Sequence, residues 1–185
     1  MIYVIDHNDS FTHNVVHQLS LFDEVECDNY NEVKENKIKQ ASTIVFSPGP
    51  GNPKNYPTTS KIYKKFKGKK KIIGICLGFQ HILFCEGAKI IEQKKIYHGF
   101  QSNVKVINKQ SLFKKGKVFK VGRYHSLKLK EPFKTNNFEI TMRCLNSNVA
   151  MAFENNKDKI YGFQFHPESF LTINGNILIK KILSA

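Results

Sequence analysis

The stretch from Lys71 to Gln80, KIIGICLGFQ, constrains the fold of this chain more than any other. A run of apolar residues leads into Gly-x-Cys-x-Gly, and a helical pattern follows. This order predicts a strand, a sharp turn and a helix, with Cys76 at the turn. Gly74 and Gly78 leave room for such a turn because they carry no Cβ. At the start of a helix, unpaired N–H groups and the helix dipole favour the thiolate form of a cysteine.

A second motif, GFQFHPES, covers residues 162–169. Here His166 and Glu168 stand two residues apart at the end of an apolar strand. A histidine in such a place can act as a base, and a nearby carboxylate can orient it. Together with Cys76, these residues predict a thiol hydrolase or an amidotransferase.

The length of 185 residues is enough for one domain with its own core, spanning residues 1–185. No apolar run reaches the roughly 18 residues that a membrane span needs. The N-terminal residues 2–6 have the pattern of a strand and not of a signal peptide. No CxxC motif occurs among the four cysteines, and we expect a reducing, cytoplasmic setting. These cysteines are Cys27, Cys76, Cys85 and Cys144.

The formal net charge of +14 raises the question of a nucleic-acid partner. Seven of the eleven residues from Lys61 to Lys71 are lysine, but Arg123 and Arg143 are the only arginines. Phosphate-binding surfaces commonly use arginine, and no RNA-binding aromatic motif is visible. We therefore expect a solvated lysine face, with neither nucleic acid nor membrane as a partner.

Strand and helix patterns alternate in the first half of the chain. They predict strands at 2–6, 24–27, 43–46 and 71–75, and helices at 11–21, 32–40, 57–66 and from the Cys76 turn through Cys85, with Ser10 or Asp9 as the first N-cap. This rhythm predicts an α/β fold with a mostly parallel central sheet and helices on both faces. The second half predicts a smaller mixed or antiparallel sheet, with strands at 88–92, 104–107, 118–121, 138–144, 149–153 and 160–165, and a closing helix at 171–183.

Three of the predicted strands end in loops of unusual composition. The strands that end at Phe46, Ile75 and Phe165 are followed by SPGPG, by the Cys76 turn and by HPES, respectively. In an open α/β sheet, ligands bind outside the carboxyl ends of the strands. We therefore expect the three loops to meet at one edge of the sheet.

Six motifs together resemble class I (triad-type) glutamine amidotransferase domains over nearly the full length of the chain. They are Asp9-Ser10-Phe11-Thr12, Ser47-Pro48-Gly49-Pro50-Gly51, Gly74-Ile75-Cys76-Leu77-Gly78 with Gln80, His98-Gly99, Tyr124-His125-Ser126-Leu127 and the 162–169 motif. The first two are similar to those of the small glutaminase subunits of anthranilate synthase and aminodeoxychorismate synthase. The resemblance implies a flavodoxin-like, single-domain fold.

The resemblance also implies roles for the candidate catalytic residues. Cys76 would attack the γ-carboxamide of L-glutamine, His166 would take and return the proton, and Glu168 would orient His166. The backbone N–H groups of Leu77 and of Gly49, with Gly51 as the alternative to Gly49, would bind the oxyanion.

Residues on both sides of the nucleophile are implied as glutamine-binding. Gln80 and the backbone of Ser126 and Leu127 would hold the α-amino and α-carboxylate groups. The loop Gly49-Pro50-Gly51 would line the other side, where glycine allows close approach of the backbone.

The residues and their spacing predict no cofactor and no metal. His13 and His17 have the spacing of two helical ligands, but no third ligand accompanies them.

The implied partner is a larger chorismate-binding synthase subunit that receives ammonia, in a heterodimer or heterotetramer. The pathway can be that of tryptophan or of folate. A stand-alone γ-glutamyl hydrolase or peptidase, and a non-catalytic lysine-rich binding module, remain as alternatives.

Two positions depart from the family pattern. Phe79 stands where the family usually has histidine, and Phe100-Gln101 stand where Lys-Thr is common. Phe79 is not a member of the implied triad, so the chemistry should survive. Phe100 and Gln101 lie in a segment expected near the partner.

Overall fold

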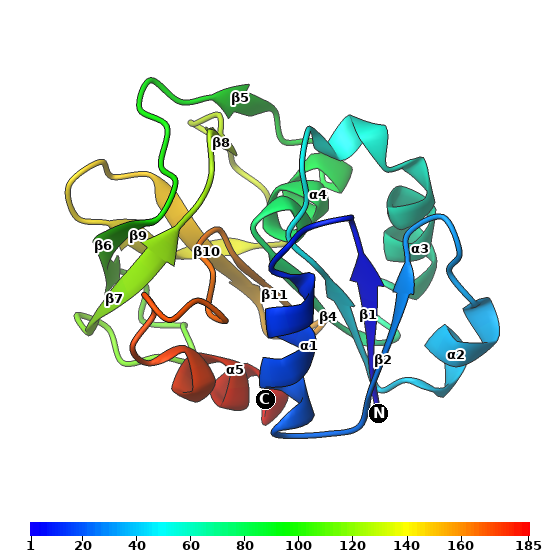
Figure 1. The fold of residues 1–185 in the computed structure, drawn as a ribbon. Coiled ribbons are helices and arrows are strands. Elements are labelled where there is room, and N and C mark those ends of the chain that lie inside the picture. Colours follow the sequence, from blue (N-terminus) through cyan, green and yellow to red (C-terminus); the bar gives the residue numbers. More distant parts are fainter.

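A nine-stranded sheet forms the centre of the computed structural model, which describes residues 1–185 (Figure 1). Its strands are β1 (Ile2–Asp6), β2 (Val25–Asn29), β3 (Thr43–Phe46), β4 (Lys71–Ile75), β6 (Phe100–Val106), β7 (Val118–Arg123), β9 (Glu139–Cys144), β10 (Ala150–Asn155) and β11 (Ile160–Phe163). They lie in the order β2-β1-β3-β4-β11-β10-β9-β6-β7. The α/β fold class predicted from the sequence is confirmed.

The sheet has a parallel half and an antiparallel half. Strands β2, β1, β3, β4 and β11 pair in parallel. From β11 onward through β10, β9, β6 and β7 every pair is antiparallel. The antiparallel strands therefore extend the central sheet. The small separate sheet consists of β5 (Ile90–Glu92) and β8 (Leu127–Leu129), which pair antiparallel.

Helices cover both faces of the sheet because successive side chains of a strand point to opposite sides. Ile2 and Val4 of β1 pack in one core with α1 (Thr12–Ser20) and α5 (Gly175–Leu183). Tyr3 and Ile5 pack in a second core with α2 (Glu35–Gln40), α3 (Pro57–Phe66) and α4 (Leu77–Cys85). A short 3₁₀ helix (Pro53–Asn55) precedes α3. No helix has the length and apolarity that crossing a membrane requires.

Three helix starts differ from the prediction, and one of them is that of α2, which begins at Glu35 and not at 32. Helix α1 has no side-chain cap, and the carboxylate of Asp9 instead accepts the N–H of Phe11 at 2.8 Å. Helix α5 begins at Gly175 and not at 171. The hydroxyl of Thr172 donates to the His166 carbonyl at 2.6 Å and accepts from the Gly122 N–H at 2.9 Å. The segment before α5 is therefore bonded through Thr172 to Gly122 and His166, and it does not continue the helix.

Four neighbouring parallel strands end at the same edge of the sheet. Strands β1, β3, β4 and β11 lie side by side, and their carboxyl ends are at the top of Figure 1. The loops that follow them carry the motifs singled out in the sequence. This arrangement brings Ser47, Cys76 and His166 to one place, as the strand pattern predicts, and adds His7, which follows β1.

Candidate active site

Cys76 occupies a strained turn between β4 and α4. Its backbone has φ 53° and ψ −99°, a positive-φ conformation that residues other than glycine rarely adopt. Both neighbouring glycines are sterically required. A Cβ on Gly74 would lie 2.5 Å from the Gly78 carbonyl carbon, and one on Gly78 would lie 2.8 Å from the Phe46 Cβ. The predicted strand, turn and helix are therefore present, with the thiol at the turn.

His166 and Glu168 form a buried pair. Nδ1 of His166 lies 2.6 Å from Oε1 of Glu168, and the two side chains are 2% and 0% exposed. Nε2 of His166 is buried without a hydrogen-bond partner. Burial by itself lowers the pKa of His166, but the charge of Glu168 and the neighbouring Cys76 sulfur raise that pKa well above its ordinary value. The pair can therefore hold a proton close to the Cys76 thiol.

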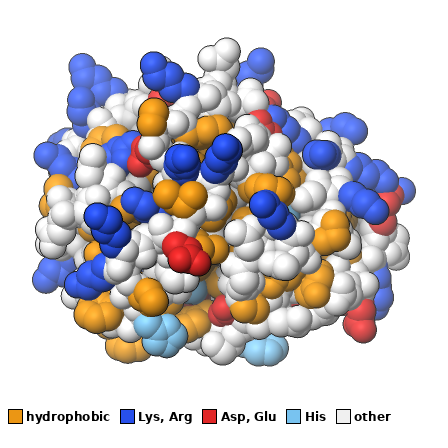
Figure 2. Space-filling view, turned by 90° about the horizontal axis from the view of Figure 1, so that it is seen from above, with side chains coloured by type: hydrophobic (Ala, Val, Ile, Leu, Met, Phe, Trp, Pro, Cys, Tyr) orange, Lys and Arg blue, Asp and Glu red, His pale blue; other side chains and the backbone are white.

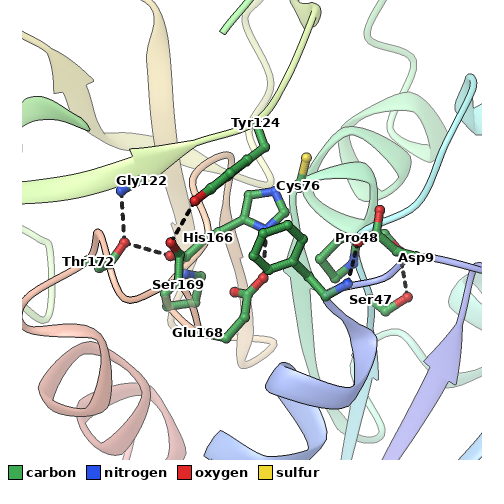
Figure 3. Close-up of polar contacts among 12 residues, drawn as sticks. Asp9, Ser47, Pro48, Cys76, Gly122, Tyr124, His166, Glu168, Ser169 and Thr172 are labelled. Atoms are coloured by element: carbon green, nitrogen blue, oxygen red, sulfur yellow. Dashed lines mark hydrogen bonds and ion pairs between the residues drawn. The ribbon is translucent and has the colours of Figure 1, made fainter. Parts of the chain in front are cut away.

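The backbone of His166 is fixed from two sides. Its N–H donates to the Gly122 carbonyl at 3.0 Å, which forms an isolated antiparallel bridge to the end of β7. Its own carbonyl accepts the Thr172 hydroxyl, which also binds the Gly122 N–H (Figure 3). His166 is therefore held to the antiparallel half of the sheet, while Cys76 follows the parallel half.

Two aromatic rings enclose the imidazole. The centroids of Phe11 and Tyr124 lie 5.0 Å and 4.9 Å from that of His166, and 4.7 Å from each other. The Tyr124 hydroxyl is 3.0 Å from Oγ of Ser169 (Figure 3). Both rings come from motifs quoted above, but sequence reasoning assigned them no role. They shield the His166–Glu168 pair from water, which strengthens its electrostatic interaction.

A chain of amides leads from the predicted glutamine-binding backbone to the thiol. The Gln80 amide donates to the Leu127 carbonyl at 3.3 Å and to Oε1 of Gln164 at 3.1 Å. Nε2 of Gln164 in turn lies 3.9 Å from Sγ of Cys76. Gln164 was not singled out in the sequence. The available signal was a polar residue between two phenylalanines in an apolar strand, since a buried amide needs partners.

The backbone at Ser126 and Leu127 is held by buried side chains. Nε of Arg123 donates to Nε2 of His125 at 3.0 Å, so the proton of this imidazole is on Nδ1 and is available to the Leu127 carbonyl at 2.8 Å. Burial lowers the pKa of His125 to about 3, helped by the charge of Arg123. The imidazole is therefore neutral. The Ser126 side chain is exposed, and its carbonyl accepts the Gln93 N–H.

The SPGPG loop lies against the first turn of α4. A Cβ on Gly49 would lie closer than 3.0 Å to Cδ2 of Leu77. The Gly49 N–H donates no hydrogen bond within the chain, and the Leu77 N–H, at the first helical position, has no partner within its helix. Pro50 and Gly51 are exposed at the rim. The two residues that carry the predicted oxyanion donors are thus in contact.

Phe79 points into the core and not into the site. It is fully buried, and its ring centroid lies 5.1 Å from that of Phe153, with Gly162 against it. The departure from the family pattern at this position therefore changes packing under α4 and leaves the Cys76 side chain untouched. No cluster of three or more histidine, cysteine or acidic side chains is arranged to hold a metal ion.

Comparison with known proteins identifies the family of this chain. The family model described as glutamine amidotransferase class-I matches residues 3–185. The chain therefore belongs to the class-I glutamine amidotransferase family.

Individual relatives match over nearly the whole chain. Anthranilate synthase component 2 of Lactococcus lactis subsp. lactis is 36% identical over 186 residues, which cover 100% of this chain and 94% of that protein. The protein of the same name from Helicobacter pylori (strain 26695) is 36% identical over 188 residues, covering 97% and 94%. A solved structure from Thermoplasma acidophilum, described as one of the subunits of GMP synthase, matches with a TM-score of 0.84 at 21% identity, covering 99% of this chain and 92% of that one. At that identity the match shows the fold alone.

Proposed function

We propose that this chain is the glutaminase subunit of a chorismate-using synthase, and specifically of anthranilate synthase. It hydrolyses L-glutamine through a thioester on Cys76 and delivers ammonia to a larger subunit. The observation that carries the proposal is the buried His166–Glu168 pair beside a cysteine in a strained turn. The names of the similar proteins support anthranilate over 4-amino-4-deoxychorismate as the product.

The reaction divides the work among three side chains. The Cys76 thiol gives its proton to Nε2 of His166, and the sulfur attacks the γ-carbon of glutamine. When the tetrahedral intermediate collapses, the C–N bond breaks and His166 returns the proton to the departing ammonia. His166 then takes a proton from water, which attacks the thioester and releases glutamate. Glu168 holds the imidazole and stabilises its charged form.

Two backbone N–H groups stabilise the oxyanion. Gly49 and Leu77 lie in contact. The Gly49 N–H donates no hydrogen bond within the protein, and the Leu77 N–H has no partner within its helix. Loss of one such donor typically costs about 3 kcal/mol of transition-state stabilisation.

The α-amino and α-carboxylate groups of glutamine bind at the far end of the amide chain. The backbone of Ser126 and Leu127 contacts them, with the Gly49-Pro50-Gly51 loop on the other side. Because the Gln80 amide already donates to the Leu127 carbonyl, Gln80 acts in part by placing this backbone.

The alternatives have less support. A lysine-rich binding module needs no buried triad, and Figure 2 shows lysine and arginine side chains scattered over the face above the sheet edge, with hydrophobic side chains between them. A stand-alone γ-glutamyl hydrolase needs no ammonia acceptor, whereas the similar proteins are named as one component of a synthase.

The test is to purify the chain with the synthase subunit that it captures and to supply chorismate. Glutamine and ammonium salts should both support synthesis by the wild-type complex. The Cys76→Ala variant should retain only the ammonium reaction. The product identifies the pathway, since anthranilate and 4-amino-4-deoxychorismate differ in absorbance and mass. Turnover of γ-glutamyl peptides without any partner would instead establish the stand-alone hydrolase.

A further inference from the structure

We propose that Ser47, supported by His7 and Thr59, is a positioning residue that fixes the direction of the Gly49 N–H. The inference rests on the proposed function, because it gives that N–H its task as an oxyanion donor. It assigns a role to three buried polar residues that do not touch the substrate.

The hydroxyl of Ser47 holds one peptide unit of the SPGPG loop. It donates to the Pro48 carbonyl at 2.6 Å, and the residue is fully buried (Figure 3). The Pro48–Gly49 peptide is trans, since the single cis bond is at Pro132. In a planar trans peptide, the C=O and the next N–H point in opposite directions. By holding the carbonyl, Ser47 therefore turns the Gly49 N–H away from the protein interior.

His7 and Thr59 fix the hydroxyl in turn. The backbone N–H of His7 donates to Oγ of Ser47 at 2.9 Å, and Nδ1 of His7 lies 3.2 Å from the same oxygen. Because Ser47 uses its own proton on Pro48, Nδ1 must be the donor. Nε2 then accepts from the Thr59 hydroxyl at 2.9 Å. In this series of hydrogen bonds from Thr59 through His7 to Ser47, each donor has an acceptor, and all three side chains are fully buried.

The charge state of His7 agrees with this assignment. Burial, together with the neighbouring His81, lowers the pKa of His7 to about 3. The imidazole is therefore neutral near pH 7, with one nitrogen donating and the other accepting. A protonated His7 could not accept the Thr59 hydroxyl.

Packing leaves the peptide little freedom apart from this hydroxyl. Gly49 is wedged between His7 and Leu77, because a Cβ on Gly49 would lie 2.6 Å from the His7 Cβ and closer than 3.0 Å to Leu77. Rotation of the peptide about its own axis remains possible, and this is the motion that Ser47 blocks. Tyr56 holds the Pro50–Gly51 peptide of the same loop in a similar way, with its hydroxyl on the Pro50 carbonyl at 2.8 Å.

The test distinguishes a change in the direction of the Gly49 N–H from general disorder of the site. It compares reactions that need an oxyanion donor with a reaction that does not. Glutamine hydrolysis by the complex needs the donor, and so does reversible inhibition by the γ-aldehyde analogue of glutamine, which forms a tetrahedral adduct on Cys76. Alkylation of Cys76 by iodoacetamide forms no oxyanion. We would compare Ser47→Ala, Ser47→Thr and Thr59→Val in all three reactions.

We expect Ser47→Ala to lower kcat by about tenfold or more, with KM changed by less than about twofold. The affinity for the aldehyde should fall by the same factor as kcat, and the alkylation rate should stay unchanged. Thr59→Val should give a smaller loss of the same kind, and Ser47→Thr should restore most of kcat. Thr141→Val is the matched control, because the Thr141 hydroxyl is equally buried but has no partner.

Wild-type kcat in Ser47→Ala would overturn the proposal. So would a loss that appears equally in alkylation, since that result indicates general disorder of the site. Absence of glutamine turnover in the wild-type complex would refute the proposed function itself, and is thus a separate outcome.

Discussion

Cys76 donates its backbone N–H to the carbonyl of Phe163, at 2.8 Å. Phe163 ends β11, three residues before His166. The main chain of Cys76 is thus bonded to the strand that leads to His166. Because a main-chain bond sets this spacing, substitutions of the catalytic side chains should leave the frame of the site intact, and their effects can be interpreted as chemistry.

The strained backbone at Cys76 predicts different stabilities for two inactive variants. Cys76→Gly should be more stable than Cys76→Ala by about 1 kcal/mol, because glycine adopts a positive φ without steric cost. Urea denaturation of both variants measures the difference. Equal stabilities would mean that the turn at φ 53° carries no strain.

Selective labelling should identify the nucleophile. A chloroketone analogue of glutamine should modify Cys76 much faster than the other three cysteines, as peptide mapping after brief exposure would show. Cys27 is the most exposed competitor, but partial desolvation and the carboxylates of Asp6 and Asp28 raise its pKa to about 11. It is therefore a thiol at neutral pH and a poor nucleophile. Preferential labelling of Cys27, Cys85 or Cys144 would contradict the assignment.

Substitutions of His166 and of Glu168 should reduce glutamine-dependent activity to different extents. His166→Ala should abolish glutamine-dependent synthesis, whereas Glu168→Gln should retain a partial rate because Glu168 transfers no proton. Both variants should keep the ammonium-dependent reaction of the partner. If Glu168→Gln were as inactive as His166→Ala, Glu168 would have a chemical role beyond orientation.

Buried neutral histidines predict loss of stability in acid. Burial lowers the pKa of His81 to about 4, so the folded state binds fewer protons than the unfolded state between about pH 4 and 6.5. Stability from this residue is therefore full above about pH 6.5 and falls as the pH drops toward 4. His81→Leu should reduce the slope of unfolding free energy in this window by up to about 1.4 kcal/mol per pH unit.

The exposed His17 provides the control for this measurement. His17→Gln should leave the slope as in the wild type. Equal slopes in wild type and His81→Leu would show that His81 takes up no proton on unfolding in this range.

Partner binding should raise the glutaminase rate. Hydrolysis in isolation wastes ammonia, so we expect it to be slow, and a tenfold gain requires only about 1.4 kcal/mol of differential stabilisation. The segments 9–12, 53–56 and 98–102 are the expected contact region. Phe100 lies there and is 48% exposed. Phe100→Glu should weaken activation when partner is titrated in, without changing hydrolysis by the chain alone.

Leu21→Glu is the matched control for this surface. Leu21 is similarly exposed, but it follows α1 at the opposite edge of the sheet (Figure 1). Its substitution should not affect activation. A full glutaminase rate in isolation, unchanged by partner, would instead support the stand-alone hydrolase.

The parallel half of the sheet could be predicted from the sequence because its strands are apolar, β-branched and separated by amphipathic helices. Strands β3 and β4 have the predicted bounds. Strand β8 was not predicted, since Leu127–Leu129 is too short to show a period and its partner β5 lies far away in the chain. The start of α5 depends on the tertiary contacts of Thr172, which no local pattern contains.

The candidate site shows the same division. Cys76, His166 and Glu168 could be singled out because each follows a strand end in a motif. The enclosure of His166 by Phe11 and Tyr124, and the support of Ser47 by His7 and Thr59, join residues that are distant in the chain. Such contacts arise from the packed fold, and sequence spacing does not show them.

The place of β11 determines when this enzyme can become active during its synthesis. It is the last strand in the chain, yet it lies between β4 and β10, and it is the only strand that joins the parallel half of the sheet to the antiparallel half. A ribosome therefore completes the turn at Cys76 well before the strand that brings its base. Until β11 inserts, Cys76 lacks the base that we assign to it. The proposed triad is thus complete only when β11 has joined the two halves of the sheet.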